Sequence, residues 1–183
     1  ISIERGHDPK RFAAMPFGGG GALHAGALVR EIGLAAAIVP RFPGVNSALG
    51  CVMSDLRHDE VRTLNRILDT LDCGMLTAMI AEINASSKEV IKRSKASIEG
   101  LEAVIELDML YLGQTHAVPV PLSVSDSGIK TEAIRAAFDA SYRRTYGRLL
   151  ENIPVRVLNL RLSVIGKRPK VDIANLAHGE RAA

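Results

Sequence analysis

The chain has 183 residues, 47% of them hydrophobic, so it can bury a core in one domain or in two small ones. Its net charge of +3 comes from basic residues dispersed among 20 acidic ones, and aromatic residues are only 4% of the chain, which argues against a nucleic-acid partner. No apolar run approaches the roughly 18 residues that span a bilayer, so we expect no membrane partner.

The N-terminal third reads as a βαβ unit. Asp8 and Pro9 suit the N-cap and the first position of a helix, and the apolar run at 34–40 fits a buried parallel strand. The expected elements are a short helix to Ala14, a strand at 15–17, a turn at Gly18–Gly21, a helix at 22–32 closed by Gly33 and the strand at 34–40.

A second helix is expected after a Pro-Gly turn, with Asn46 or Ser47 as its N-cap and an end near Leu56. Residues 57–64 are expected to be extended. Apolar residues at helical spacing then predict a long amphipathic helix at 68–93.

After this helix the apolar period changes to two. Strands at 101–112 and 115–122 form a predicted antiparallel hairpin, and Pro119 and Pro121 place the second strand at a sheet edge. The chain is then expected to form a helix at 129–146 that ends at Gly147, followed by a strand at 153–166 with one solvent-exposed face. A polar tail follows this strand.

These elements predict an α/β fold with an α+β second part. We expect a first domain at 1–62, a second at 63–166 with the order helix, strand, strand, helix, strand, and a polar tail at 167–183.

Four consecutive glycines, Gly18–Gly21, stand between a predicted strand and a predicted helix. Such a turn places unpaired N–H groups at the positive end of the helix dipole and removes the Cβ atoms that would keep a ligand away, which outlines a nucleotide site. It is not a Walker A loop, because no Lys-Ser/Thr pair follows, and it does not fit Gly-x-Gly-x-x-Gly. A tight turn with close helix–strand packing is the alternative.

Three separated blocks resemble the hydantoinase A / 5-oxoprolinase family. The first, from Asp8 to Thr63, is similar to the family's Phe-Gly-Gly-Ala-Gly-Pro-Leu-His and Pro-Gly-…-Ser-Ala-Leu-Gly segments, with Gly20 standing where the family has Ala. The second, "DMLYLGQTHAVPVPL", resembles its Asp-x-Arg-Tyr-x-Gly-Gln segment, and the third, "FDASYRRTYGRLLENIPVRVLNLRLSVIG", resembles its closing stretch.

The resemblance implies an actin-like ATPase fold of the ribonuclease H-like type. ATP would lie between two lobes, and the glycine turn of the second lobe would let the backbone approach the adenosine and the inner phosphates. The family's phosphate-gripping Asp-x-Gly-Gly-Thr segment is absent here. This implies that Mg²⁺ and the γ-phosphate are held mainly by an N-terminal part upstream of Ile1, where the catalytic residues would also lie. We therefore expect a C-terminal fragment that is inactive alone.

The candidate nucleotide-binding residues are Gly18, Gly19, Gly20, Gly21, His24, Asn46 and Ser47. His24 could contact a phosphate or the ribose, or could pack within the fold, and Asn46 and Ser47 could instead only cap a helix.

No metal site is expected, because Asp55, His58 and Asp59 lack a fourth ligand and favour a solvated charge cluster. Asp108, Tyr111 and Gln114 could line a substrate or subunit surface, or Asp108 could be a paired strand residue.

In this family ATP hydrolysis drives the opening of a cyclic amide, 5-oxoproline or a hydantoin, or a related carboxylation. The resemblance thus implies part of an ATP-dependent hydrolase of the N-methylhydantoinase or 5-oxoprolinase type, with a cyclic amide substrate and a homo- or hetero-oligomeric state that includes a second subunit.

Cys51 and Cys73 form no disulfide framework, which predicts a cytoplasmic protein. A non-catalytic assembly module, using the long helix and the hairpin, is the alternative.

Overall fold

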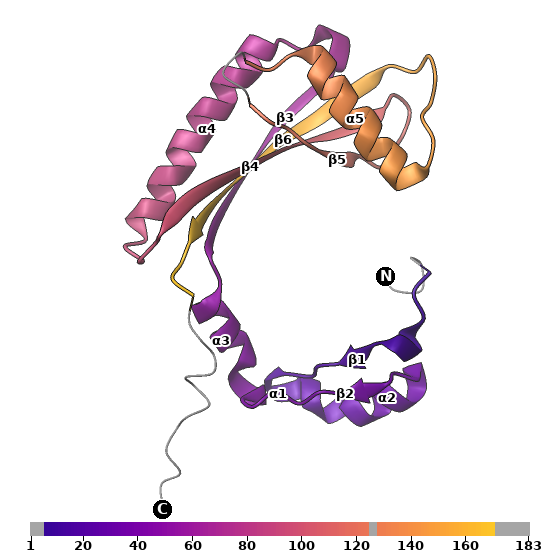
Figure 1. Ribbon diagram of the computed structural model, residues 1–183, viewed down its shortest axis with the longest axis vertical. Coiled ribbons are helices and arrows are strands. Elements are labelled where there is room, and N and C mark those ends of the chain that lie inside the picture. The colour runs from indigo at the N-terminus through magenta and orange to yellow at the C-terminus, as the bar shows by residue number, and fades with distance from the viewer. Residues whose placement is uncertain (1–5, 125–127, 171–183) are drawn as a thin grey trace, which may run out of the picture. The chain divides into compact units, whose positions relative to one another are not determined.

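The computed structural model describes residues 6–124 and 128–170 (Figure 1). The chain divides into two units, an N-terminal unit that ends at Ser54 and a C-terminal unit from Asp55 to Pro169. Within the described ranges, no helix is both long enough and apolar enough to cross a membrane.

The N-terminal unit consists of short elements. They are the 3₁₀ turn η2 (Pro9–Arg11), β1 (Ala13–Ala14), α1 (Gly18–Gly21), the 3₁₀ turn η3 (Ala22–His24), α2 (Ala25–Ile32), β2 (Ala36–Ala37), the 3₁₀ turn η4 (Pro43–Val45) and α3 (Asn46–Met53).

Strands β1 and β2 confirm the predicted parallel pairing, but not its extent or position. Ala13 pairs with Ala36 and Ala14 with Ala37. The first strand precedes the predicted 15–17 segment, because Asp8 caps only the three-residue turn η2 and the chain becomes extended at Phe12. Both residues of β2 are exposed, so the prediction of a buried strand is wrong for this unit taken by itself.

None of the described residues of the N-terminal unit is buried. Its large apolar side chains that are more than about a third exposed are Phe12, Met15, Phe17, Leu23, Leu28, Ile32, Ile38, Val39, Phe42, Val45 and Val52. Exposed apolar groups in such number are typical of surfaces that another part of a protein or a partner covers. The described part of this unit therefore has no core of its own.

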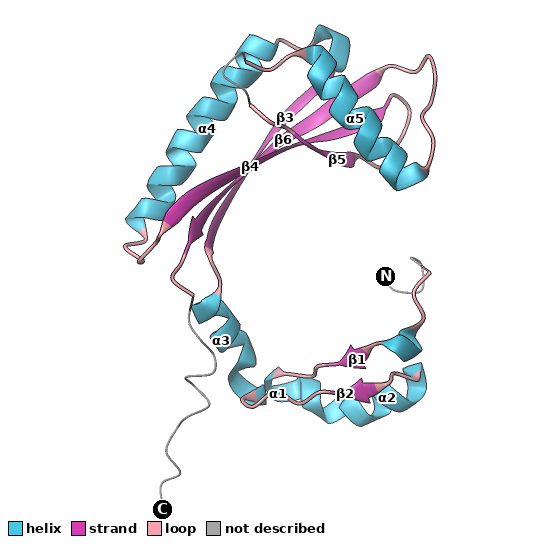
Figure 2. Ribbon diagram, viewed as in Figure 1, coloured by secondary structure: helices cyan, strands magenta, loops and turns pink. Residues whose placement is uncertain are grey.

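The C-terminal unit is an antiparallel sheet with two helices (Figure 2). The strand order is β3-β6-β4-β5, and α4 and α5 lie on the same side of the sheet. The elements are β3 (Leu56–Ile67), the 3₁₀ turn η5 (Leu68–Thr70), α4 (Cys73–Arg93), β4 (Gly100–Tyr111), β5 (Val118–Pro121), α5 (Thr131–Tyr146) and β6 (Val155–Lys167).

Helix α4 confirms the long amphipathic helix but begins later than predicted. The carboxylate of Asp72 accepts a hydrogen bond from the backbone N–H of Met75 at 3.0 Å, which satisfies a free donor of the first turn. Residues 68–70 before it form the separate turn η5. The buried residues of α4 recur every three or four positions and face the sheet: Leu76, Ile80, Ile83, Ser87 and Ile91.

The hairpin, its edge and the last helix agree with the sequence prediction. β4 and β5 pair antiparallel, and β5, which carries Pro119 and Pro121, is the edge strand. Helix α5 ends at Gly147. Strand β6 pairs with both β3 and β4 and so forms the middle of the sheet.

The structure divides between Ser54 and Asp55, not at residues 62 and 63. The boundary lies earlier than predicted because β3 is one continuous strand that begins at Leu56. This strand pairs with β6 from its first residue, where Leu56 lies opposite Gly166. Residues 56–62 therefore belong to the sheet of the C-terminal unit. The part of the predicted polar tail beyond residue 170 lies outside the described residues.

Candidate functional site

The four glycines are helical, which corrects the prediction of a turn. Gly18 to Gly21 form α1, and the chain continues without a break into η3 and α2. Only Gly18, with φ of 80°, has a backbone conformation that L side chains rarely adopt. Gly21 has φ of −64° and ψ of −36°, an ordinary right-handed helical conformation that alanine would favour.

Nothing in the described chain explains why Gly19, Gly20 and Gly21 lack side chains. A Cβ atom built at any of these positions would meet no atom within 4 Å. Glycine in a helix costs about 1 kcal/mol relative to alanine, so three of them cost roughly 3 kcal/mol. Within the N-terminal unit taken by itself, neither backbone conformation nor packing offsets this cost, and the Cβ positions are open.

The other predicted nucleotide residues lie in neighbouring elements of the same unit. His24 ends η3 directly after the glycines, and α1 contacts η4, which leads into Asn46. Asn46 and Ser47 are not N-caps, because the capping position is Val45 and both residues already belong to α3. The side chains of all three polar residues are without hydrogen-bond partners among the described residues, so they remain available to a ligand.

Asp55, His58 and Asp59 hold local ion pairs. Asp59 accepts hydrogen bonds from Ser163 Oγ and from Arg57 Nε, and these two bonds hold the pKa of Asp59 below its ordinary value of 3.8. Asp55 lies 3.4 Å from Lys167 Nζ, and His58 lies 3.7 Å from Glu60. Across 6–124 and 128–170 no three His, Cys, Asp or Glu residues are grouped as a metal site would need.

Asp108 is a paired strand residue. It is 8% exposed, and its carboxylate accepts hydrogen bonds from Arg161 Nε at 2.8 and 2.9 Å and from Asn159 Nδ2 at 2.9 Å. Of the two readings that the sequence left open, the structural role holds, because both partners come from the adjacent strand β6.

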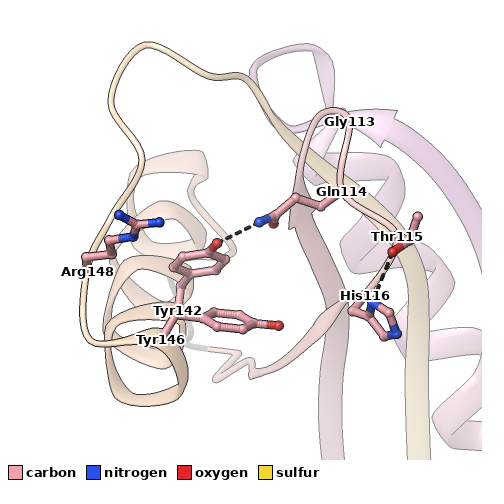
Figure 3. Close-up of a pocket in the computed structure, with 7 residues that line it drawn as sticks. All are labelled: Gly113, Gln114, Thr115, His116, Tyr142, Tyr146 and Arg148. Atoms are coloured by element: carbon pink, nitrogen blue, oxygen red, sulfur yellow. Dashed lines mark hydrogen bonds between the residues drawn. The ribbon is translucent and has the colours of Figure 1, made fainter.

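Gln114 does line a pocket, together with residues that the sequence analysis did not connect to it. The pocket has a volume of about 460 Å³ and lies between the β4–β5 turn and the end of α5 (Figure 3). Its lining residues are Gly113, Gln114, Thr115, His116, Tyr142, Tyr146 and Arg148. Tyr111 is fully buried behind it, and its hydroxyl has no hydrogen-bond partner among the described residues.

Residues 1–60 match the family model described as Hydantoinase/oxoprolinase. The chain also aligns, at 29% identity over 181 residues, with the caprolactamase subunit alpha of Pseudomonas jessenii. The chain is thus similar to the hydantoinase/oxoprolinase family, through residues 1–60 and through this relative. This alignment covers 97% of the chain but 26% of the relative, so the chain spans about a quarter of the length of the curated protein it matches.

Two solved structures of enzymes share the mixed α/β fold of this chain. The crystal structure of the ATP-dependent caprolactamase from Pseudomonas jessenii matches with a TM-score of 0.63 at 28% identity, over 93% of this chain and 26% of that one. The nucleotide-free structure of acetone carboxylase matches with a TM-score of 0.71 at 22% identity, over 92% of this chain and 26% of that one. The second likeness concerns the fold alone.

Proposed function

We propose that this chain is one part of a longer ATP-dependent enzyme that opens a cyclic amide, and that Gly18–Gly21 form one wall of its adenine-nucleotide site. The similarity of residues 1–60 to the hydantoinase/oxoprolinase family supports the enzyme class, and the ATP-dependent caprolactamase among the similar structures supports the use of ATP. A related carboxylation is the alternative reaction, because the chain also aligns, at 26% identity, with the acetone carboxylase beta subunit of Xanthobacter autotrophicus.

The bare helix α1 is the observation that carries this proposal. Its glycines have open space where a Cβ would stand, at a cost of roughly 3 kcal/mol in helix propensity. We infer that a bound group occupies the space of the missing side chains at Gly19 and Gly21, whereas Gly20 stands where the family resemblance has alanine and need not be bare. An adenosine that lies flat against the backbone is such a group, because a Cβ on the contacting face would hold it about 1.5 Å farther away.

The polar neighbours of α1 complete this wall. His24, Asn46 and Ser47 have free side-chain donors and acceptors for a ribose or an inner phosphate. When bound, ATP supplies the phosphoryl group that activates an amide or carbonyl oxygen. The residues of this chain bind and orient the adenosine end of the nucleotide and carry no step of the reaction itself.

The proposed wall, made of glycines with His24, Asn46 and Ser47, has no carboxylate of the kind that Mg²⁺ usually takes from a protein, and no three potential ligands are grouped within 6–124 and 128–170. We therefore assign Mg²⁺ and the γ-phosphate to the rest of the longer enzyme, in the two-lobed, actin-like arrangement that the sequence resemblance implies. The same remaining part would cover the exposed apolar side chains of the N-terminal unit, such as Phe17 and Leu23.

The proposal extends to partners and location. The relative from Pseudomonas jessenii is named as a subunit, which supports a second subunit for this enzyme as well. Both cysteines are free thiols, Cys51 exposed and Cys73 half-buried, and this fits a cytoplasmic enzyme.

The second candidate function is a non-catalytic assembly module. It is favoured by the same exposed apolar side chains, which another polypeptide could cover without any nucleotide. In that case the glycines of α1 would be bare because a second backbone, and not ATP, packs against them.

Saturation-transfer NMR from the longer protein to ATP separates the two candidates. We expect transfer to the adenine protons and its loss in Gly19→Asp, which adds a bulky negative charge to the proposed wall. Gly26→Asp in α2 is the matched control, because Gly26 is also helical and also has no atom within 4 Å of a built Cβ. Transfer that survives Gly19→Asp would favour the assembly module.

A further inference from the structure

The pocket between the β4–β5 turn and the end of α5 lies entirely within the C-terminal unit. Its first wall is a turn in which the Gln114 N–H donates to the Tyr111 carbonyl at 3.0 Å, with Gly113 at φ of 93°. Because L side chains rarely adopt this φ, glycine fixes the shape of the turn. Gln114 is thereby held at the rim of the pocket (Figure 3).

A buried tyrosine forms the floor of the pocket. Tyr142 is 3% exposed, and its ring packs edge-on against Tyr111 with centroids 4.8 Å apart. Its hydroxyl oxygen accepts a hydrogen bond from Gln114 Nε2 at 2.7 Å, while Gln114 Oε1 accepts one from the Tyr111 N–H. The hydroxyl proton of Tyr142 has no acceptor among the described residues and is free for a ligand that lies in the pocket.

The second wall supplies a cation and a further ring. The ring of Tyr146 lies 4.6 Å from that of Tyr142, centroid to centroid. Arg148 lies beside Tyr142 in Figure 3, and its guanidinium forms no ion pair or hydrogen bond with any described residue. His116 binds Thr115 through Nδ1 at 2.9 Å, which leaves Nε2 without a described partner.

The free groups of the pocket are mostly donors, and none of its lining residues is acidic. Such a set selects an anion, because it offers a guanidinium fork and hydroxyl protons and would leave a ligand's own donors unpaired. A single arginine balances one negative charge, whereas phosphate dianions are usually held by further cations or by a nest of backbone N–H groups. The two tyrosine rings favour a flat or apolar body behind the charged head.

We propose that this pocket binds a small monocarboxylate, with Arg148 paired to the carboxylate, Tyr142 donating its hydroxyl proton and Tyr146 covering the ligand body. The volume of about 460 Å³ lies within the range of roughly 300–1,000 Å³ that small-molecule sites occupy. This role rests on the C-terminal unit alone and is independent of the proposed nucleotide wall.

Titration of the full chain with benzoate and with hexanoate, followed by saturation-transfer NMR, tests the proposal. We expect at least one of them to saturate the protein below about 20 mM, and the neutral amide of that acid, benzamide or hexanamide, to bind about tenfold or more weakly. Arg148→Gln should weaken carboxylate binding about tenfold or more, and Tyr146→Phe by less than that.

Arg144→Gln is the matched control, since Arg144 is exposed in the last turn of α5 and does not line the pocket. It should change carboxylate affinity less than about twofold. The proposal is overturned if neither acid saturates the protein, if acid and amide bind equally, if Arg144→Gln acts as strongly as Arg148→Gln, or if inorganic phosphate displaces the acid at a lower concentration than the acid itself needs.

Discussion

Gly166 in the C-terminal unit and Gly19 in the N-terminal unit differ in the space that a side chain would find around them. A Cβ at Gly166 would stand 2.8 Å from Ile91 Cγ2 and 3.2 Å from Ile98 Cγ2, so the packing of α4 on the sheet requires glycine there. A Cβ at Gly19 would meet no atom within 4 Å. The packing inside the C-terminal unit explains its glycine, whereas nothing inside the N-terminal unit, taken by itself, explains Gly19.

The largest effect should come from truncating a core ring of the C-terminal unit. Phe138 is 0% exposed and contacts Tyr111 with ring centroids 5.0 Å apart, so Phe138→Ala should lower the free energy of unfolding by about 3–5 kcal/mol. Phe17→Ala, at a side chain that is 46% exposed, should change it by less than about 0.5 kcal/mol. Urea unfolding followed by circular dichroism measures both, and equal losses would remove the contrast between the units.

Replacing a tightly packed glycine and an open glycine by alanine should change the stability of the chain in opposite directions. Gly166→Ala should destabilise the chain by about 1–3 kcal/mol, because Ile91 must move. Gly20→Ala should instead stabilise it by up to about 1 kcal/mol, since Gly20 is helical and its Cβ space is open. The same urea-unfolding experiment measures the change in unfolding free energy for both variants. A loss of stability in Gly20→Ala would show that α1 is packed internally after all.

Two tyrosines that are in contact should respond differently to losing a hydroxyl. Tyr111→Phe removes a buried hydroxyl with no partner among the described residues and should be neutral or stabilising by up to about 1 kcal/mol. Tyr142→Phe removes the acceptor of the Gln114 hydrogen bond and should cost about 1 kcal/mol. Thermal unfolding of the two variants side by side would contradict this assignment if Tyr111→Phe proved the more harmful.

The smallest effect concerns pH. The pKa of Asp59 is lowered in the folded state, so its stabilising contribution is complete above its ordinary value of 3.8 and is lost as pH falls through the lowered value. Its side chain is 54% exposed, and the loss in Asp59→Asn at pH 7 should not exceed about 0.5 kcal/mol. Urea unfolding of wild type and Asp59→Asn, at pH 7 and at several pH values below 3.8, should show the difference between them shrinking as pH falls, and a constant difference would contradict this assignment.

Periodic segments were predictable from sequence, because burial on one face leaves a repeating pattern. The apolar positions of α4 and the alternation along β6 fixed those elements to within a few residues. Helix α1 was missed because glycine is among the poorest helix formers, so four in a row read as a turn. Asn46 was misread as a cap because η4 already sets a helical path one residue earlier.

The candidate sites were predictable only in part. The bare glycines of α1 could be found because adjacent residues form them. The carboxylate pocket could not, since Gln114 belongs to the hairpin whereas Tyr146 and Arg148 follow from the end of α5, and only the packing of α5 beside the sheet brings them together. A surface shared by distant segments leaves no local pattern in the sequence.

The most direct test of the central claim compares Gly19→Ala with Gly20→Ala in the longer protein, measuring ATP affinity and unfolding free energy together. The account predicts that neither variant loses stability, that Gly19→Ala weakens ATP binding about tenfold, and that Gly20→Ala, at the position where the family resemblance places alanine, leaves it within about twofold. Unchanged ATP affinity in Gly19→Ala, with or without a loss of stability, would contradict it.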